Sequence, residues 1–356
     1  MMSRTEIVGW LRETDLSRLD LLRSDADETR CRHVGDSVHL RGIIDFSNHC
    51  TRRCTYCGIN ADNKTLRRYR MSIDEIVTCA KSFKAQGLMT VVLQSGEDRR
   101  NTTDWITELI LRIRQETGLA ITLSLGERRP EELETWRTAG AERYLLKIET
   151  TDRALYESTQ PGRRNAWPSR FATLETLRAL DYEVGSGIMV GLPGQTMESL
   201  ADDLVHLGRF GPDMIGIGPW IPHPAASISL AARDETDQVP NDLRTTLKVL
   251  ALARLVCPDT NLPATTALLS VGLLQAWEGG LSGGANVIMP DRTPAHYGRL
   301  YTIYPGRISF APEDLMVLRD AIHRMGRTIS SDSGASAHYQ KRTSAMIAQA
   351  GGEGSR

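Results

Sequence analysis

Short runs of β-branched and other apolar residues alternate along the chain with longer amphipathic stretches. The short runs have the length of buried strands, and the longer stretches repeat their apolar positions every three or four residues, as helices do. The predicted strands span residues 39–46, 90–95, 120–125, 143–149, 184–191, 214–219, 261–266 and 285–289. The predicted helices span residues 72–86, 102–117, 130–139, 168–180, 196–209, 241–256 and 270–278.

Eight strands with intervening helices over about 250 residues are typical of a (β/α)8 barrel, so we predict an α/β protein with a TIM-type barrel. A doubly wound open sheet is the alternative that the pattern leaves open. We expect three parts. Residues 1–38 form an N-terminal helical extension, residues 39–327 form the barrel with a segment that returns across its mouth, and residues 328–356 form a weakly ordered tail, because they are small, polar and rich in Gly and Ser.

Composition excludes several classes of function. The 356 residues carry a formal net charge of −1, which gives no electrostatic footprint for nucleic acid. No apolar run approaches the roughly 20 residues that a membrane span needs. The first fifteen residues are polar and lack the apolar stretch of a secretory signal. We therefore expect a cytoplasmic protein that binds neither nucleic acid nor a membrane, and we interpret the basic run at 64–70 as a solvated connector.

Half of the six cysteines stand in the stretch HCTRRCTYCG, as Cys50, Cys54 and Cys57. Disulfides are not needed by a chain of this length in a reducing compartment. A structural zinc site needs four ligands, and no fourth ligand stands at knuckle spacing. An iron–sulfur cube can be held by three thiolates, which leaves one iron open for a small molecule. The C-x3-C-x2-C spacing thus favours an iron–sulfur site.

Polar residues follow the predicted strands, where a barrel places its active site. Strands of parallel sheets are usually buried and apolar, so carboxylates at their ends suggest a ligand. Helix caps and first-turn acids are the alternative interpretation for Glu97, Glu127 and Glu149. Strand ends also carry other candidates: Gln94, Ser95, Gly96, Ser124, Thr150, Pro219, His223, Thr265, Thr266 and Met289.

From about residue 38 to 307 the chain resembles the HydE-type [FeFe]-hydrogenase maturases, in the biotin-synthase-like branch of the radical S-adenosylmethionine (SAM) enzymes. The segments that carry the resemblance follow one another in order: DFSNHCTRRCTYCGINADNKTLRRYRMS, VVLQSGED, ITLSLGE, AGAERYLL, GIMVGLPGQT, DMIGIGPWIPHP, LPATTA, GGANVIMP and LYTIYPG. Together they are far more specific than three cysteines.

The resemblance implies roles for individual residues. Cys50, Cys54 and Cys57 would bind a [4Fe–4S] cluster as the metal-binding and catalytic residues, and SAM would chelate the open iron. SAM would be bound by Tyr56, Ser95, Gly96, Glu97, Glu149, Arg170, Tyr301 and Tyr304. The substrate cavity would be lined by Gln94, Ser124, Ile148, Thr265, Thr266 and Met289. Without the resemblance, Arg170 would be an exposed helix charge and the two C-terminal tyrosines would be core residues.

Two departures from the family stand out. The family usually has Arg-His before the strand-4 glutamate, where this chain has Lys147 and Ile148. An isoleucine in the cavity wall would favour a less polar or smaller substrate and would weaken support for hydrogenase maturation. Ser309 stands where some members carry the first cysteine of a second cluster, and no cysteine follows Cys257, so we expect one cluster only.

By resemblance, the protein is a radical SAM enzyme that cleaves SAM to methionine and a 5′-deoxyadenosyl radical. It would act on a cysteine-derived organometallic iron complex in assembly of the [FeFe]-hydrogenase diiron subcluster. Its partners would be that substrate, an electron donor such as ferredoxin or flavodoxin, and other hydrogenase maturases. A HydE paralogue acting on a small amino acid or thiazolidine-like substrate is one alternative. A non-catalytic iron–sulfur carrier is the other.

Overall fold

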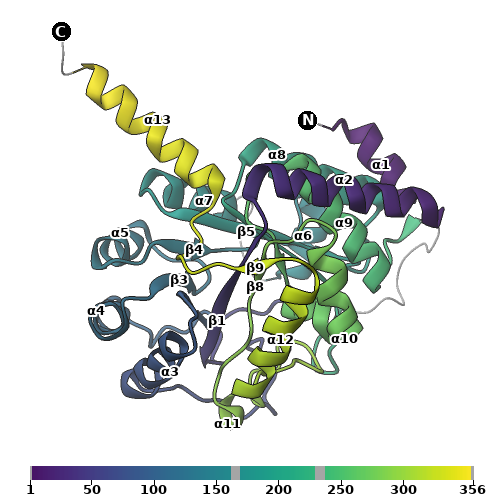
Figure 1. Ribbon diagram of the computed structural model, residues 1–356. Coiled ribbons are helices and arrows are strands. Elements are labelled where there is room, and N and C mark those ends of the chain that lie inside the picture. The colour runs from purple at the N-terminus through teal and green to yellow at the C-terminus, as the bar shows by residue number, and fades with distance from the viewer. Residues whose placement is uncertain (1, 162–168, 229–236, 354–356) are drawn as a thin grey trace.

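The computed structural model describes residues 2–161, 169–228 and 237–353. Eight parallel strands close into a barrel in chain order, because β1 pairs with both β2 and β8. This confirms the (β/α)8 prediction over an open sheet (Figure 1). The barrel strands are β1 (Ser37–Ser47), β2 (Thr90–Ser95), β3 (Ala120–Ser124), β4 (Arg143–Leu145), β5 (Glu183–Val190), β6 (Met214–Pro219), β7 (Pro263–Ala264) and β8 (Val287–Ile288).

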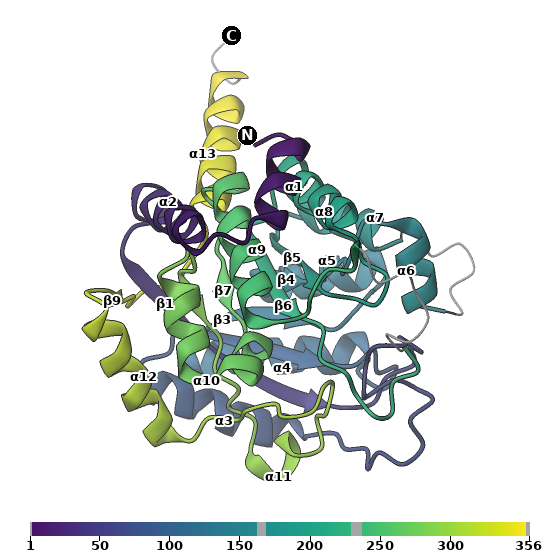
Figure 2. The same ribbon diagram turned by 90° about the vertical axis from the view of Figure 1, so that its right-hand side faces the viewer.

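Helices cover the barrel and agree with the predicted ranges to within a few residues at most ends (Figure 2). They are α3 (Ile73–Ala85), α4 (Thr103–Thr117), α5 (Pro130–Ala139), α6 (Arg153–Thr159), α7 (Ser169–Ala179), α8 (Met197–Phe210), α9 (Leu243–Val256) and α10 (Thr266–Leu281). Ser72 caps α3 with Glu75 in the predicted capping box. The sequence did not predict α6, and residue 168 of the predicted helix 168–180 lies outside the described residues.

The N-terminal residues form two helices, α1 (Arg4–Arg12) and α2 (Leu16–Val34). They pack on α8 and α9, and the ammonium of Lys248 donates to the carbonyls of Leu11 and Glu13 at 2.8 and 2.7 Å. α1 lies along α8, where Arg4 pairs with Asp202 at 2.6 Å and Arg12 pairs with Glu198, in the first turn of that helix, at 2.6 Å. α2 ends beside the start of β1, at the amino-terminal end of the barrel (Figure 1).

The C-terminal segment returns along the barrel as α11 (Ala295–Gly298) and α12 (Pro312–Arg324), followed by β9 (Thr328–Ile329) and α13 (Ala337–Glu353). The structure differs here from the expected weak order of the tail. β9 pairs with the first residues of β1, and residues 330–342 pass under the amino-terminal end of the barrel. There the carbonyl of Gly334 accepts a hydrogen bond from buried Arg41 at 2.7 Å, and Ser336 N–H donates to Glu183 at 2.9 Å.

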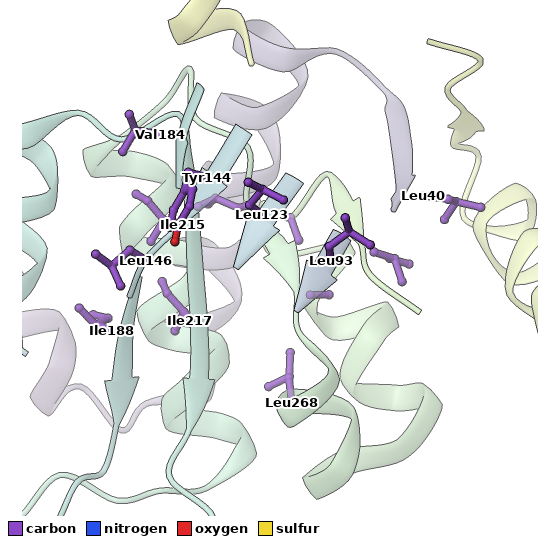
Figure 3. Close-up of a cluster of buried hydrophobic side chains, with 14 of the residues drawn as sticks. Leu40, Leu93, Leu123, Tyr144, Leu146, Val184, Ile188, Ile215, Ile217 and Leu268 are labelled. Carbon is purple, nitrogen blue, oxygen red and sulfur yellow. The ribbon is translucent and has the colours of Figure 1, made fainter. Parts of the chain in front are cut away.

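The barrel strands are buried on both faces, as parallel strands usually are. Most of their side chains join one large apolar core between strands and helices, part of which is drawn in Figure 3. A smaller apolar cluster draws its members from four different strands or their ends: Ile43, Val92, Met214, Val287 and Met289. Because alternate strand residues share a face, we interpret this cluster as a layer across the barrel interior, between the amino-terminal end and the mouth.

Candidate active site

The cysteine loop follows β1 directly and is held by hydrogen bonds within the chain. The guanidinium of Arg68 donates to four carbonyls of this loop, those of Asn48, Ile59, Asn60 and Asn63, at 2.5, 2.7, 2.6 and 3.2 Å. Five donors on one planar group suit such a task. Lys64 and Arg67 of the basic run at 64–70 are exposed, as in a solvated connector, but Arg68 organises the loop. Charge count alone could not show this, because carbonyls carry no formal charge.

Two glycines allow the backbone to approach the cysteines closely. A Cβ on Gly96 would lie 2.3 Å from the carbonyl oxygen of His49 and 2.7 Å from Cβ of Cys50. A Cβ on Gly58 would lie 2.0 Å from the carbonyl oxygen of Thr302, and its N–H donates to the carbonyl of Ile303 at 2.9 Å. The loop is thus packed between the end of β2 and the C-terminal segment.

One cavity of about 280 Å³ lies at the mouth of the barrel and is lined by all three cysteines. Most predicted site residues line it with them: Tyr56, Gln94, Ser95, Gly96, Glu97, Ser124, Glu149, Arg170, Tyr301 and Tyr304. They come from the ends of four strands, from α7 and from the C-terminal segment. Residues that are more than a hundred positions apart in the sequence therefore meet around one space.

Four residues predicted for the cavity wall do not line it: Ile148, Thr265, Thr266 and Met289. Ile148 is 1% exposed in the main apolar core, while its neighbours Lys147 and Glu149 face the cavity. These residues follow the end of β4 but stay paired with β5, where Glu149 N–H donates to the carbonyl of Gly187 at 3.1 Å and Met189 N–H donates to the carbonyl of Glu149 at 3.0 Å. Ile148 is thereby turned away from the side that Lys147 and Glu149 face. The predicted isoleucine wall is therefore wrong, and the predicted substrate preference loses the observation on which it depended.

Local structure also explains why Thr265, Thr266 and Met289 do not line the cavity. Thr265 caps α10 and donates to the carbonyl of Ile217 at 2.9 Å. Thr266 begins that helix and accepts a hydrogen bond from the hydroxyl of Tyr304 at 3.1 Å, so it supports a cavity residue without lining the space. Met289 belongs to the apolar layer below. The helix begins four residues before its predicted start, because Thr265 is already its cap.

Glu149 is held in a strained backbone conformation, with φ of 69°, which a non-glycine residue rarely adopts. Such outliers cluster at functional sites. Its Oε2 lies 2.9 Å from the ammonium of Lys147, yet it is buried and makes no hydrogen bond with any residue that the structure describes. The stem of Lys147 passes over Gly187 and Gly216: a Cβ on either would lie 2.9 or 4.0 Å from it.

Arg170 enters the cavity from α7 and is 8% exposed, so it is not the exposed helix charge of the alternative interpretation. Its guanidinium donates to the carbonyl of Lys147 at 2.5 Å and to Oε1 of Glu127 at 3.3 Å. Burial raises the pKa of the Glu127 carboxyl, and the positive charge of Arg170 opposes that rise. Arg170 is thus positioned from two sides and turned toward the cavity.

The segment that carries the two tyrosines is tied to the barrel through Arg307. Its guanidinium lies 2.5 Å from Asp45 and 2.9 Å from Asp291, and it stands over the ring of Tyr301. Asp45 also accepts a hydrogen bond from the amide of Gln94 at 2.9 Å. This network fixes the C-terminal segment across the mouth, as the sequence predicted, and orients Gln94 beneath it.

Burial raises the pKa of each cysteine thiol in the loop, that of Cys54 to about 11. Iron binding must therefore displace thiol protons. Among the described residues, no three His, Cys, Asp or Glu side chains converge as ligands of a single metal ion would. A cube fits this arrangement, because each of its thiolates binds a different iron. Two buried polar atoms that line the cavity and lack hydrogen-bond partners among the described residues, Glu149 Oε2 and the indole N–H of Trp220, also indicate room for a polar ligand.

Sequence reasoning missed several residues of this site. Arg52, between two of the cysteines, pairs with Glu97 and lines the cavity. Trp220 follows β6 directly and could have been found by its position at a strand end. Lys147 was found only as a departure, although its place two residues before Glu149 already put it on the same face. Met189 and Ile303 line the cavity and carry no sequence signal.

This site defines the class of the protein as a radical SAM enzyme. Its three cysteines follow the first barrel strand, and they share the cavity with a buried arginine and with a carboxylate oxygen that makes no hydrogen bond among the described residues. The Radical SAM superfamily model matches residues 44–207. Enzymes of this class use a [4Fe–4S] cluster and SAM. The chain is 44% identical over 312 residues to the [FeFe] hydrogenase maturase subunit HydE of Thermotoga maritima, which covers 87% of this chain and 86% of that protein. The chain belongs to the HydE family.

More distant relatives agree with the fold. The 3-methylornithine synthase of Methanosarcina acetivorans is 29% identical, over 76% of this chain and 74% of its own. The crystal structure of methylornithine synthase (PylB) superposes with a TM-score of 0.81 at 24% identity, covering 93% of this chain and 94% of that one. The longest apolar helices among the described residues fall short of what a membrane span requires.

Proposed function

We propose that this enzyme cleaves SAM reductively and acts in assembly of the [FeFe]-hydrogenase diiron subcluster, on a cysteine-derived iron complex, in the cytoplasm. The observation that carries the proposal is the 44% identity to HydE over nearly the whole of both chains, together with a cavity that holds all three cysteines. A non-catalytic carrier has no use for the buried arginine and strained glutamate that share this cavity. We propose ferredoxin or flavodoxin as the electron donor and other maturases as partners.

In this proposal the chemistry of each side chain decides which part of the cluster or of SAM it binds. Cys50, Cys54 and Cys57 would hold the [4Fe–4S] cluster, which when bound supplies the electron that cleaves SAM to methionine and a 5′-deoxyadenosyl radical. The guanidinium of Arg170 suits the carboxylate of the methionine part of SAM through charge-assisted hydrogen bonds. Oε2 of Glu149 suits its amino group.

The walls of the cavity complete this site. Gly96 lets the end of β2 pack directly on Cys50, because a Cβ at this position would lie 2.7 Å from Cβ of Cys50. Tyr301 and Tyr304, held over the mouth by Arg307 and Thr266, exclude water from the reacting atoms. We propose that Gln94, Ser124 and Lys147 face the substrate, since they line the cavity on the barrel side.

A second candidate is a small amino acid or thiazolidine-like substrate. The observation that favours it is Lys147, whose ammonium stands in the cavity where the family usually carries an arginine. A lysine cannot make the bidentate hydrogen bonds of an arginine. A planar substrate group that accepts two parallel hydrogen bonds, such as a carboxylate, would therefore be held less well. Both candidates use the same radical chemistry.

Complementation tests the proposal. A strain that lacks its own HydE is expected to regain hydrogen evolution with the wild-type chain and to lose most of it with Arg170→Ala. Purified Arg170→Ala should keep its iron and bind SAM several-fold more weakly, because the charge-assisted hydrogen bonds are gone. Arg209→Ala, an exposed arginine on α8, is the matched control and should behave as wild type.

Failure of the wild type to restore hydrogen evolution, with SAM cleavage intact in vitro, would favour the second candidate. Failure of the pure, cluster-loaded protein to cleave SAM would contradict the radical chemistry itself.

A further inference from the structure

A second hollow, of about 380 Å³, opens beside the cysteine loop on the outer side of the mouth. Its lining includes Cys50 and five cationic residues, which are Lys64, Arg68, Arg70, Arg99 and Arg100. Cys50 and Glu97 line both this hollow and the active-site cavity, whereas Cys54 and Cys57 line the cavity alone. The Cys50 side of the cysteine loop therefore faces the hollow.

The hollow is strongly cationic, although the chain as a whole is nearly neutral. Five cationic side chains and two carboxylates line it. Both carboxylates are already paired: Asp98 with Arg70 at 2.6 and 2.9 Å, and Glu97 with Arg52. Arg99 and Arg100 are exposed and have no ion pair in the part of the chain that the structure describes. An uncompensated positive surface of this kind attracts an acidic partner and speeds its association.

The cationic surface is rigidly joined to Cys50. Arg99 and Arg100 stand on the loop after β2, three and four residues beyond Gly96, whose backbone packs on Cys50. That loop is bonded to the cysteine loop on both sides: Gly96 N–H donates to the carbonyl of Ser47 at 3.1 Å, and Thr51 N–H donates to the carbonyl of Glu97 at 3.0 Å. A partner seated on the arginines would thus be held at a fixed, short distance from one cysteine of the cluster site.

We propose that this cationic hollow is the docking site of a small acidic electron-carrier protein, which delivers its electron on the Cys50 side. One electron leaves the reduced carrier, which becomes oxidised by one electron, and enters the [4Fe–4S] cluster, which changes from the 2+ to the 1+ state. No atom or proton need be transferred. The inference rests on the proposed radical SAM function. A flavin-bearing and an iron–sulfur carrier share the acidic surface that the hollow recognises.

The test uses the cluster-loaded enzyme with flavodoxin in one arm and a small ferredoxin in the other. The double variant Arg99→Glu/Arg100→Glu is compared with Lys84→Glu/Arg324→Glu, which makes the same charge change on exposed residues at the far ends of α3 and α12. Binding of each oxidised carrier is measured calorimetrically, and cluster reduction by each reduced carrier is followed by absorbance. Photoreduced deazaflavin, a small uncharged reductant, reports the cluster's intrinsic reducibility.

The wild type and the Lys84/Arg324 variant should bind at least one carrier, with affinity and reduction rate falling about 10-fold or more between roughly 0.01 M and 1 M salt, because screening shortens the reach of the charges. The Arg99/Arg100 variant should lose a similar factor already at low salt and keep the wild-type rate with deazaflavin. Unchanged carrier binding in that variant, or no binding by either carrier to the wild type, overturns the docking proposal. A cluster that deazaflavin reduces without any SAM cleavage would instead contradict the proposed function.

Discussion

The two ends of the barrel interior both hold charged side chains, but they pair them differently. At the amino-terminal end, buried Arg143 pairs with Glu183, and Asp213 pairs with His338 and Arg342 of the tail. At the mouth, Oε2 of Glu149 has one ion pair and no hydrogen bond among the described residues, and Arg170 faces a cavity. The apolar layer around Val92 separates the two ends. Buried charges paired within the chain serve stability, whereas those left facing a cavity indicate a ligand.

The largest expected effect is at the mouth, and it should leave the other end untouched. Cys54→Ala is expected to abolish cluster assembly, whereas the wild type should bind about four irons per chain after anaerobic reconstitution. Addition of SAM should change the EPR spectrum of the reduced wild-type cluster and have no effect on the variant. Cys31→Ala, an exposed cysteine on α2, is the control and should bind iron as the wild type does. About eight irons in the wild type would reveal a second cluster.

Mutations at the amino-terminal end of the barrel should lower the free energy of unfolding and leave SAM binding unchanged. Glu183→Gln removes the charge that Arg143 needs and leaves buried cations unpaired, which is expected to cost about 3–5 kcal/mol of the free energy of unfolding. Glu157→Gln breaks an exposed ion pair with Arg153 and should cost less than about 1 kcal/mol. Denaturant unfolding of the cluster-free proteins measures both. A large loss of SAM affinity in the folded Glu183→Gln enzyme would contradict this division between the two ends.

How much of this could be predicted from the sequence depends on the range of the interactions. Period and strand count predicted the barrel, and strand ends predicted part of the cavity lining, because both follow from local patterns. Arg170, Tyr301 and Tyr304 were predicted only through the family resemblance. The predicted strand 143–149 alone would have placed Lys147 and Glu149 on one face and Ile148 on the other, as the structure has them, although β4 itself ends at Leu145. The interpretation followed the family's residue instead of the strand's geometry.

Contacts between residues far apart in the sequence could not be predicted. The tail is small and polar, and nothing in its composition shows that Gly334 and Ser336 meet Arg41 and Glu183 under the barrel. Small residues suit that place because they bring backbone groups close to buried charges. The role of Arg68 could not be predicted either, because its partners are backbone carbonyls, which the sequence does not distinguish from any others.

The smallest expected effect concerns Lys147. Its side chain is 27% exposed, and we expect its ammonium to compete with the amino group of SAM for Oε2 of Glu149. Lys147→Met should therefore tighten SAM binding by about 2- to 5-fold, the scale of a partly exposed ion pair. Equilibrium binding to the cluster-loaded enzyme measures it, with Lys84→Met on α3 as control. Weaker binding in Lys147→Met would show that the lysine itself contacts SAM.

The four carbonyls gathered by Arg68 have a consequence for how the enzyme matures. Many small metal-binding modules are shaped only when the ion arrives, so for them folding and metal uptake are one event. Here the loop that carries the three thiols is also held by hydrogen bonds of the polypeptide, so its shape does not rest on the metal alone. The arginine therefore takes part in receiving iron and sulfide without binding either of them.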